Sequence, residues 1–274
     1  MASKVPKYAA RLDALHRALA RDFRDILGRL PLEPDASVVD VGCGDGFFSA
    51  LLLDRIPRGR VLALDTSPAY LEAAGRRLAG AVADDRCRLL EGDAAKMPFE
   101  DASLDAVLSA HSMQSYESIP DVLAECHRIL KPGGLLAVLE TDNVHSIMLS
   151  WPPDLELAVR QAEHREIGDE DSYIGTYFPR FAPRMFHDAG FQDSRREYVF
   201  IERQRAGGDD ALAEYIRAYI DDLAKRLAGE LSEGHLDRLR QLADPRSQSY
   251  LPRQGNFFFG SLQTLITGRA SSAA

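Results

Sequence analysis

The feature that most constrains the fold of this chain is a glycine-rich turn that directly follows an apolar run. The segment reads Val38-Val39-Asp40-Val41-Gly42-Cys43-Gly44-Asp45-Gly46-Phe47. Its apolar start is typical of a buried strand, and residues 47–55 have helical character. Glycines let the backbone approach a bound molecule closely, and doubly wound folds bind nucleotides at such a turn. The segment therefore predicts a strand, a ligand-binding turn and a helix.

Short apolar runs and helical segments alternate along this half of the chain. Strands are predicted over residues 38–41, 60–64, 87–91, 104–110 and 135–140, and helices over residues 47–55, 68–78 and 119–130. The last of these helices is expected to end at Lys131-Pro132-Gly133-Gly134, because this segment supplies a cation near the helix end, a proline that cannot continue a helix and a glycine turn. Alternation of this kind predicts a parallel sheet with helices on both faces.

Further elements are predicted on either side of this core. Apolar residues at helical spacing predict one N-terminal helix over residues 8–30. Beyond residue 141, helices are predicted over 155–167, 181–189, 211–228 and 234–243, and strands over 196–202 and 256–267. The predicted division is a helical arm (1–34), a core (35–141), an insertion (142–178), a core helix and strand (179–203), a helical insertion (204–255) and a last strand with its tail (256–274).

Composition narrows the class of partner and the compartment. The 274 residues suffice for one large domain, and 33 Lys plus Arg against 42 Asp plus Glu give a net charge of −9. An acidic chain without a basic block is a poor candidate for binding nucleic acid. Cys43, Cys87 and Cys126 lack metal or redox spacing, which indicates free thiols in a reducing compartment. No apolar run approaches the roughly 20 residues of a membrane-spanning helix, and no secretory signal is evident, so we expect a cytoplasmic protein.

Two carboxylates near the turn indicate the charge of its ligand. Asp40 would oppose a pyrophosphate but suits a cation such as an amino group or a sulfonium. Gly46 comes one position too early for the Gly-x-Gly-x-x-Gly fingerprint of dinucleotide sites. Asp65 ends the second predicted strand, where a carboxylate accepts hydrogen bonds from ribose hydroxyls. The turn therefore calls for a ribose and a positive charge without phosphate, which S-adenosylmethionine provides.

Five blocks of the sequence resemble the class I S-adenosylmethionine-dependent methyltransferases, in particular the small-molecule branch similar to the enzymes of ubiquinone and menaquinone biosynthesis. The five blocks occur in the order and at the spacing of the family. They are residues 39–46, 63–68, 91–94 with Met97-Pro98-Phe99, 104–109 and 127–134. Residues 180–191 are similar to the family's last helix. The resemblance implies an α/β fold: a doubly wound, Rossmann-like, mostly parallel sheet of seven strands with an antiparallel last strand. It also implies methyl transfer to an O, N or C nucleophile of a small molecule.

The same resemblance assigns roles by position. Gly42 and Gly44 would pass under the methionine and ribose parts of S-adenosylmethionine, with Asp40 towards the amino end. Asp65 would hold the ribose hydroxyls, and Asp93 would accept from the adenine amino group. The full set of cofactor-binding residues implied is Asp40, Gly42, Cys43, Gly44, Asp65, Thr66, Asp93, Ala94, Ser109 and Ala110. In the family, additions such as the arm and the insertions 142–178 and 204–255 roof the cofactor and shape the substrate side.

His111 is the candidate catalytic residue. It follows a central predicted strand, where such sheets bind ligands and where the family usually has an apolar residue. A histidine titrates near neutrality and can take a proton from a hydroxyl or an amine. The alternative is a histidine hydrogen-bonded in the pocket wall. Weaker pocket candidates are Gln114, Tyr116, His145, Trp151, His164 and Tyr173, whereas His16, His127, His187 and His235 are expected to be structural or at the surface.

Several alternatives stay open at this stage. Thr141-Asp142-Asn143-Val144 resembles the Asp-Asn pair of metal-dependent catechol-type methyltransferases, but it comes later in the chain and Ser109-Ala110-His111 lacks the acidic ligand, so no metal is expected. A protein that binds the cofactor without methyl transfer remains open, as does a methyltransferase acting on RNA or protein. A nicotinamide dehydrogenase is disfavoured by the glycine spacing and by Asp40. A homodimer through the inserted helices is a further option.

Overall fold

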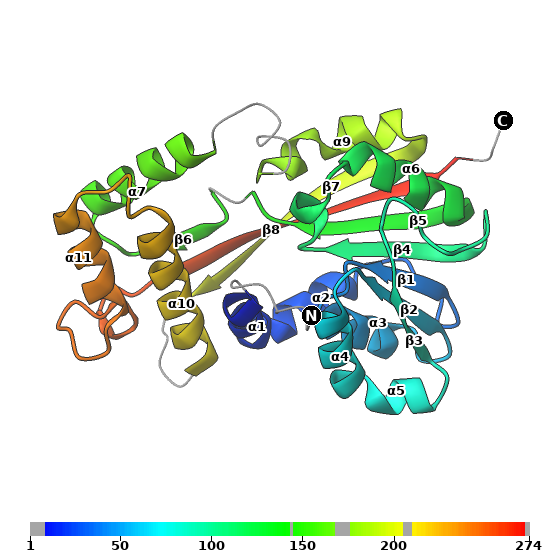
Figure 1. The fold of residues 1–274 in the computed structure, drawn as a ribbon, viewed down its shortest axis with the longest axis horizontal. Coiled ribbons are helices and arrows are strands. Elements are labelled where there is room, and N and C mark those ends of the chain that lie inside the picture. The colour runs from blue at the N-terminus through cyan, green and yellow to red at the C-terminus, as the bar shows by residue number, and fades with distance from the viewer. Residues whose placement is uncertain (1–8, 143–144, 168–175, 205–209, 272–274) are drawn as a thin grey trace.

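A computed structural model of the protein describes residues 9–142, 145–167, 176–204 and 210–271 (Figure 1). The helices are α1 (Ala9–Ala18), α2 (Ala20–Leu27), α3 (Phe47–Arg55), α4 (Pro68–Arg77), α5 (Ala79–Ala83), α6 (Ile119–Ile129), α7 (Pro153–Glu166), α9 (Phe178–Asp188), α10 (Asp210–Arg226) and α11 (Glu233–Ala243). The strands are β1 (Ser37–Val41), β2 (Arg60–Asp65), β3 (Cys87–Glu91), β4 (Leu104–Ala110), β5 (Leu130–Glu140), β6 (Ile147–Leu149), β7 (Phe191–Arg203) and β8 (Phe259–Ala270).

The strands form one sheet in the order β3-β2-β1-β4-β5-β8, with β7 on the other edge of β8. Strands β1 to β5 pair in parallel, whereas β8 runs antiparallel to both β5 and β7. This confirms the predicted doubly wound, mostly parallel sheet with an antiparallel last strand. The prediction of seven strands is wrong, because the sheet has eight. The additional strand β6 pairs with residues 259–261 of β8, a part of that strand that extends past its pairing with β5.

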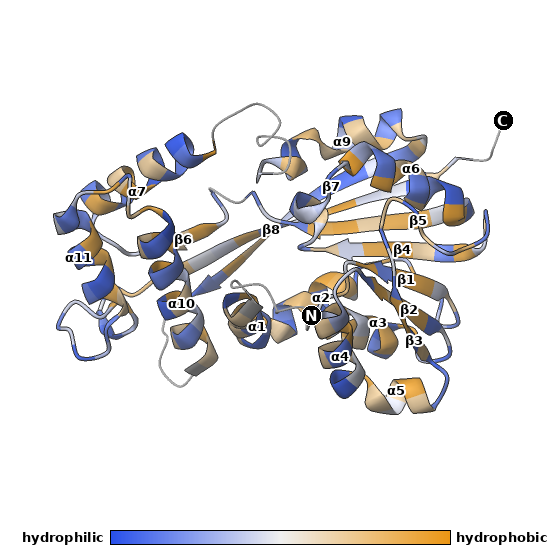
Figure 2. Cartoon of the chain, viewed as in Figure 1, coloured by the Kyte–Doolittle hydropathy of each residue, from blue (hydrophilic) through white to orange (hydrophobic). Residues whose placement is uncertain are grey.

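Both faces of the sheet are covered, as the alternation of apolar segments predicts. Val38 packs in one apolar cluster with residues of α2 and α3, whereas Val39 and Val41 belong to a second cluster with residues of α6 and α9. Successive side chains of a strand point to opposite faces, so a run of apolar residues supplies both clusters. Figure 2 shows apolar colouring along parts of β4 and β5.

Two helices beside the glycine-rich turn begin at serines. The hydroxyl oxygens of Ser67 and Ser118 accept hydrogen bonds from the backbone N–H groups of Tyr70 and Asp121, respectively. Each bond satisfies a donor that the first turn of a helix leaves unpaired. A proline follows each serine in the first turn of α4 and of α6, where the missing N–H costs nothing. Local sequence therefore fixes where these two helices start, next to the carboxyl ends of the strands.

The N-terminal arm differs from the single helix expected over residues 8–30. It consists of α1 and α2, which are separated at Leu19, where φ is −113° and ψ is 17°. The two halves meet different partners, since α1 packs against α10 and α2 packs against α3. Arg11 of α1 forms an ion pair of 2.7 Å with Asp222 of α10. The break allows the arm to join the inserted helices to the core.

The inserted segments build a second lobe at one end of the sheet. In Figure 1, α7, α10, α11 and β6 surround the ends of β7 and β8 that extend from the core. Helix α10 has an apolar stripe that is buried; it consists of Leu212, Tyr215, Ile216, Tyr219, Ile220 and Leu223. The stripe therefore packs within the chain itself.

Several predicted boundaries need correction. Strand β5 starts at Leu130, which pairs with Leu104 of β4, and the register of this pairing shifts directly afterwards. Residues 131–134, which were expected to form a turn before the strand, therefore lie in an irregular part of β5. Strand β8 begins at Phe259, three residues later than expected, and Phe258 is only half-buried. Residues 205–209 of the predicted helical insertion and tail residues 272–274 lie outside the described residues. Within the described ranges, no helix combines the length and apolar character needed to cross a membrane.

Candidate functional site

A cavity of about 800 Å³ opens at the carboxyl ends of β1, β2 and β4. Nine of the residues predicted for the site lie in its wall: Gly42, Cys43, Gly44, Asp65, Thr66, Asp93, Ala94, Ala110 and His111. Lining residues that the sequence did not single out include Asp13 and His16 of α1, Asp45, Phe47, Phe48, Tyr70, Ser112 and Glu117. The topology therefore brings together residues from four separate sequence blocks and adds one wall from the N-terminal arm.

The glycine-rich turn forms one wall of the cavity. Gly42 has φ +70°, and a Cβ there would stand 2.7 Å from the Ser112 Cβ and 2.9 Å from the Tyr116 hydroxyl. Only glycine fits this close approach between the turn and the loop after β4. Gly44 has φ +54° and lines the cavity, and no atom lies within 4 Å of the position that a Cβ would take there. The Cys43 thiol is buried, which raises its pKa far above the usual range and keeps it protonated.

Asp65 connects the end of β2 to this turn. Its Oδ2 accepts the N–H of Gly44 at 2.9 Å, and its Oδ1 accepts the N–H of Ser67 at 2.8 Å. A carboxylate has about four acceptor positions, so each oxygen keeps a free one. The side chain is thus held rigidly at the cavity wall with the capacity to accept two more hydrogen bonds, as two neighbouring ribose hydroxyls require.

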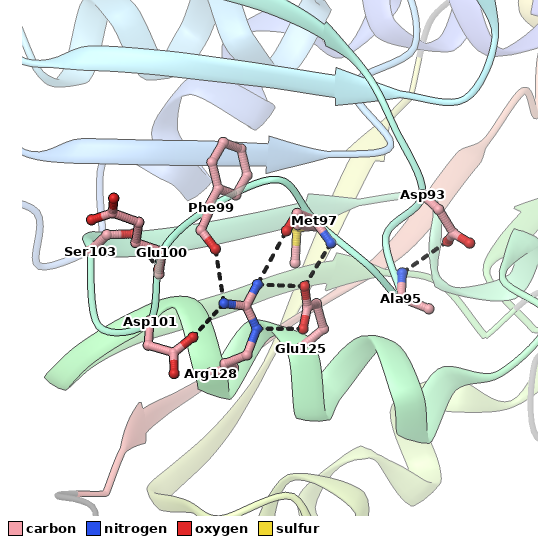
Figure 3. Close-up of polar contacts among 9 residues, drawn as sticks. All are labelled: Asp93, Ala95, Met97, Phe99, Glu100, Asp101, Ser103, Glu125 and Arg128. Atoms are coloured by element: carbon pink, nitrogen blue, oxygen red, sulfur yellow. Dashed lines mark hydrogen bonds and ion pairs between the residues drawn. The ribbon is translucent and has the colours of Figure 1, made fainter.

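Asp93 lies in a loop that α6 holds in place (Figure 3). Its Oδ1 accepts the backbone N–H of Ala95 at 2.9 Å, so it shapes its own turn and keeps its second oxygen for a ligand. Further along this loop, Arg128 donates to both oxygens of Glu125 and to Asp101. It also donates to the carbonyl oxygens of Met97 and Phe99, at 3.1 and 2.8 Å. Arg128 therefore anchors the loop that carries Asp93.

A network of hydroxyl groups lies behind the turn. Ser112 and Tyr116 both donate to the carbonyl oxygen of Val41, at 3.1 and 3.0 Å. Ser109 is fully buried, lies 2.7 Å from the Ser112 hydroxyl and does not reach the cavity wall. Burial raises the pKa of Tyr116, so its hydroxyl stays protonated. Ser109 thus supports the wall, whereas Ser112 and Tyr116 form part of it.

Asp40 also lies behind the cavity wall rather than in it. Its side chain is buried and accepts a hydrogen bond of 2.6 Å from the Ser49 hydroxyl of α3. Burial raises its pKa to about 7. The ligand contact predicted for Asp40 stays a prediction, and in this structure its carboxyl group connects β1 to α3.

His111 directly follows β4 and adopts a left-handed backbone, with φ +54°. Its N–H donates to the carbonyl oxygen of Leu139 at 2.8 Å, and its Nε2 lies 2.9 Å from Oε1 of Gln263 in β8. The Gln263 amide nitrogen donates to Ser261, so Oε1 is the acceptor and His111 Nε2 carries the hydrogen. His111 Nδ1 then keeps its lone pair, and it has no hydrogen-bond partner among the described residues. Burial lowers the pKa of this imidazole, which favours its neutral form.

His16 of α1 is a residue of the cavity wall that the sequence did not assign to the site. It was expected to be structural or at the surface, but it is 5% exposed and lines the cavity from α1. Its ring stacks on Phe47 with 4.4 Å between ring centres and lies 5.8 Å from the ring of His111. A signal was present, because position 16 falls on the same helical face as Leu12 and Leu19.

The cavity wall has a strong negative charge. Six carboxylates line it: Asp13, Asp45, Asp65, Asp93, Glu117 and Asp121. Among the described lining residues there is no lysine or arginine, although Arg77 pairs with Asp45 from behind at 2.5 Å. A wall of this sign attracts a cation and repels anions. Together with the free oxygen positions of Asp65 and Asp93, it fits an adenosine ligand that carries a sulfonium.

The weaker candidates are dispersed. Of these, Tyr116 lies in the cavity wall, whereas Gln114, His145 and His164 do not, and Tyr173 lies outside the described residues. Trp151 lines a separate cavity of about 360 Å³ next to α11. Asp142 pairs with Arg180 at 2.6 Å, and Asn143 and Val144 lie outside the described residues. In the described part of the chain, no three His, Cys, Asp or Glu side chains are grouped so that they could hold a metal.

Comparison with known proteins finds methyltransferases. The methyltransferase domain family matches residues 39–138. The demethylmenaquinone methyltransferase of Symbiobacterium thermophilum is 29% identical over 71% of this chain and 86% of its own length. The ubiquinone/menaquinone biosynthesis C-methyltransferase of Paracoccus denitrificans is 36% identical, over 42% of this chain and about half (46%) of its own.

Solved structures share the fold. Phosphoethanolamine N-methyltransferase 2 of Haemonchus contortus, in complex with S-adenosylhomocysteine, superposes with a TM-score of 0.57 at 17% identity, covering 97% of this chain and 58% of that one. The match to the methyltransferase domain and to the named methyltransferases supports the predicted cofactor, S-adenosylmethionine. Residues 39–138 of the chain therefore form a methyltransferase domain of the S-adenosylmethionine-dependent kind.

Proposed function

We propose that this methyltransferase acts on a protic group, above all a hydroxyl, of a small uncharged acceptor, with His111 as the general base. The observation that carries the proposal is the composition of the cavity wall. It combines six carboxylates with two histidines and the rings of Phe47 and Phe48, and its described part contains no lysine or arginine. The core of residues 35–141 would bind the cofactor, and the arm 1–34 and the insertions would shape the acceptor side.

The cofactor roles proposed here follow the geometry of the wall. Asp65 would accept from the ribose hydroxyls, because both of its oxygens keep a free acceptor position. Asp93 would accept from the adenine amino group, with Thr66 and the Ala94 amide beside the ring. Gly44 leaves room for close approach of the ligand, since nothing lies within 4 Å of the position of its Cβ. When bound, S-adenosylmethionine supplies a methyl group already activated on a positively charged sulfur.

The charge of the wall limits the acceptor. Relatives of this chain include enzymes named for malonyl-[acyl-carrier protein] and for trans-aconitate, and others named for demethylmenaquinone and for 2-phytyl-1,4-naphthoquinone. Carboxylate acceptors need cationic partners, and a wall with six carboxylates would repel them. A neutral aromatic acceptor would instead pack against Phe47 and Phe48. We therefore favour a phenol or a quinol.

His111 would act through Nδ1. The hydrogen bond to Gln263 keeps the hydrogen on Nε2, so the lone pair of Nδ1 can take the hydroxyl proton of the acceptor as its oxygen attacks the methyl carbon. Bound S-adenosylmethionine would supply the methyl group and keep the electron pair of the methyl–sulfur bond on sulfur, and His111 would then release the proton to water. The base matters because a hydroxyl starts out protonated. This role favours O- or N-methylation over C-methylation.

Two further points belong to the proposal. We favour a cytoplasmic location, since Cys43, Cys87 and Cys126 are free and buried. A homodimer through the inserted helices has less support, because the apolar stripe of α10 is buried within the chain.

Methyl transfer from radiolabelled S-adenosylmethionine tests the proposal directly. The acceptors are catechol and 1,4-dihydroxynaphthalene as neutral probes, and trans-aconitate and malonyl-pantetheine as anionic probes. We expect transfer to a neutral probe, with a methyl ether as the product. His111→Asn should lower kcat by about 10²- to 10⁴-fold, whereas His187→Asn, an exposed histidine on α9, should not. Transfer to the anionic probes alone would overturn the acceptor class, and full activity of His111→Asn would overturn the base.

A further inference from the structure

His16 lines the cavity but has no part in the roles described above. The helix that carries it is held from two sides. Arg17 of α1 pairs with Glu214 of α10 at 3.0 Å, and Asp13 lies 3.9 Å from Arg77 of α4. These pairs, with the Arg11–Asp222 pair, fix α1 between the inserted helices and the core. The His16 side chain is therefore held at the wall before any ligand arrives.

The surroundings of His16 are apolar. Its ring stacks on Phe47 and meets the edges of Phe23 and Phe48, with 5.9 and 5.1 Å between ring centres. Its Nε2 is buried and has no hydrogen-bond partner among the described residues. A phenylalanine would fill this position without burying an unpaired nitrogen, which is unfavourable. The choice of histidine in an aromatic cluster therefore indicates that the nitrogen is paired only when a ligand is bound.

The position of His16 relative to His111 indicates which ligand. The two rings lie 5.8 Å apart with their planes within 19° of each other, and each has one buried nitrogen that no described residue hydrogen-bonds. Burial lowers the pKa of His16 well below its usual value, and His111 and Arg77 lower it further. A neutral imidazole can donate or accept a hydrogen bond without adding charge. The pair therefore suits a neutral ligand with polar groups.

We propose that His16 is a specificity-determining residue of the acceptor site: its imidazole hydrogen-bonds a polar group of the neutral acceptor and positions that acceptor against His111. The inference rests on the proposed function above. It makes α1, outside the matched domain of residues 39–138, part of the acceptor site. His16 is a positioning residue and takes no proton in the reaction.

The test compares His16→Phe with wild type on whichever phenolic probe is methylated. The variant keeps the ring stack, so the affinity for S-adenosylhomocysteine should stay within about twofold. The KM for the acceptor should rise about tenfold or more, and kcat should change less. The melting temperature should rise by about 2–4 °C, because an unpaired buried nitrogen is removed. His16→Gln keeps a hydrogen-bonding group and should recover part of the KM. His187→Phe, an exposed histidine on α9, is the matched control and should match wild type.

The outcomes separate the two proposals. Raised stability with an unchanged acceptor KM in His16→Phe would show that the histidine is only a packing residue, and the inference would be overturned while the proposed function stands. An equal rise of KM in His187→Phe would overturn it as well. If neither neutral probe is methylated by the wild-type enzyme, the proposed function fails first, and the inference falls with it.

Discussion

Tyr116 donates its hydroxyl to the carbonyl oxygen of Val41 at 3.0 Å, and this contact sets how closely the loop after β4 approaches the glycine-rich turn. The next residue in the turn is Gly42, whose missing side chain leaves room for that hydroxyl. The cavity wall is thus made by two segments that lie more than 70 residues apart in the chain. Its shape depends on a backbone that only glycine adopts there without strain.

Gly42→Ala tests this packing. An added Cβ would stand 2.7 Å from the Ser112 Cβ in a backbone with φ +70°. We expect a loss of about 2 kcal/mol or more in the free energy of unfolding, and at least tenfold weaker binding of S-adenosylhomocysteine. Urea denaturation and calorimetry measure the two effects. Gly80→Ala on α5, where an added Cβ meets no atom within 4 Å, should not weaken either. Equal behaviour of the two variants would contradict the role of Gly42.

Asp65→Asn tests the proposed ribose contact. The amide keeps one oxygen for a backbone N–H but loses the charge and one acceptor oxygen. Loss of a charged hydrogen-bond partner costs about 1.5–3 kcal/mol, which is roughly a ten- to hundredfold lower affinity for S-adenosylmethionine in a calorimetric titration. Glu91→Gln at the end of β3, exposed and outside the cavity lining, is the control. Affinity within twofold of wild type for Asp65→Asn would remove Asp65 from the ribose site.

The pH dependence of methyl transfer should reflect the protonation of the His111 imidazole. Its pKa is lowered by burial, and the neutral form is the proposed base. Activity should therefore be lost as the pH falls through this lowered pKa, so the plateau of kcat/KM should extend below pH 6.5, the usual pKa of histidine. His111→Asn, which also accepts a left-handed backbone, should lack this acid limb. An acid limb that persists in the variant would assign it to another group.

Glu140 should make stability depend on pH. It is buried at the end of β5, accepts the N–H groups of Met113 and Thr141, and burial raises its pKa to about 7 from 4.5. The folded state then holds a proton that the unfolded state releases, so this carboxyl lowers stability as pH rises from about 4.5 to 7, by about 3 kcal/mol. Glu140→Gln should make the slope shallower in urea denaturation at several pH values, with the remainder due to the buried carboxyl of Asp40, whereas Glu33→Gln at the surface should leave the slope as in wild type. A slope unchanged in Glu140→Gln would contradict the assignment.

Arg128 should stabilise the loop that carries Asp93. Arg128→Met removes hydrogen bonds to Glu125, Asp101 and two carbonyl oxygens, which leaves those acceptors without a cation (Figure 3). We expect a loss of about 1–3 kcal/mol in stability and weaker binding of S-adenosylhomocysteine. Arg76→Met breaks an exposed pair with Glu72 within α4 and should cost less than about 0.5 kcal/mol. Similar losses of stability in both variants would show that the hydrogen bonds of Arg128 stabilise the fold no more than an exposed ion pair does.

The sequence alone predicted the core of this protein well. Alternating strands and helices, the glycine-rich turn and the carboxylate of Asp65 predicted the doubly wound sheet and its cofactor, and the domain match and the fold confirm both. These features are readable because they depend on local spacing: a period of two or 3.6 residues decides which side chains face the core, and a turn needs glycine at fixed positions.

Only the tertiary structure decided what surrounds the proposed acceptor site. The sequence placed His16 on a helix but not against His111, and it did not show that Gln263 of β8 holds the hydrogen on His111 Nε2. It also assigned Asp40 to the ligand, whereas the fold turns Asp40 towards Ser49. Helical or strand periodicity identifies an apolar face without naming its partner. That partner is chosen by the packing of segments far apart in the chain, here residues 16, 111 and 263, which no local pattern brings together.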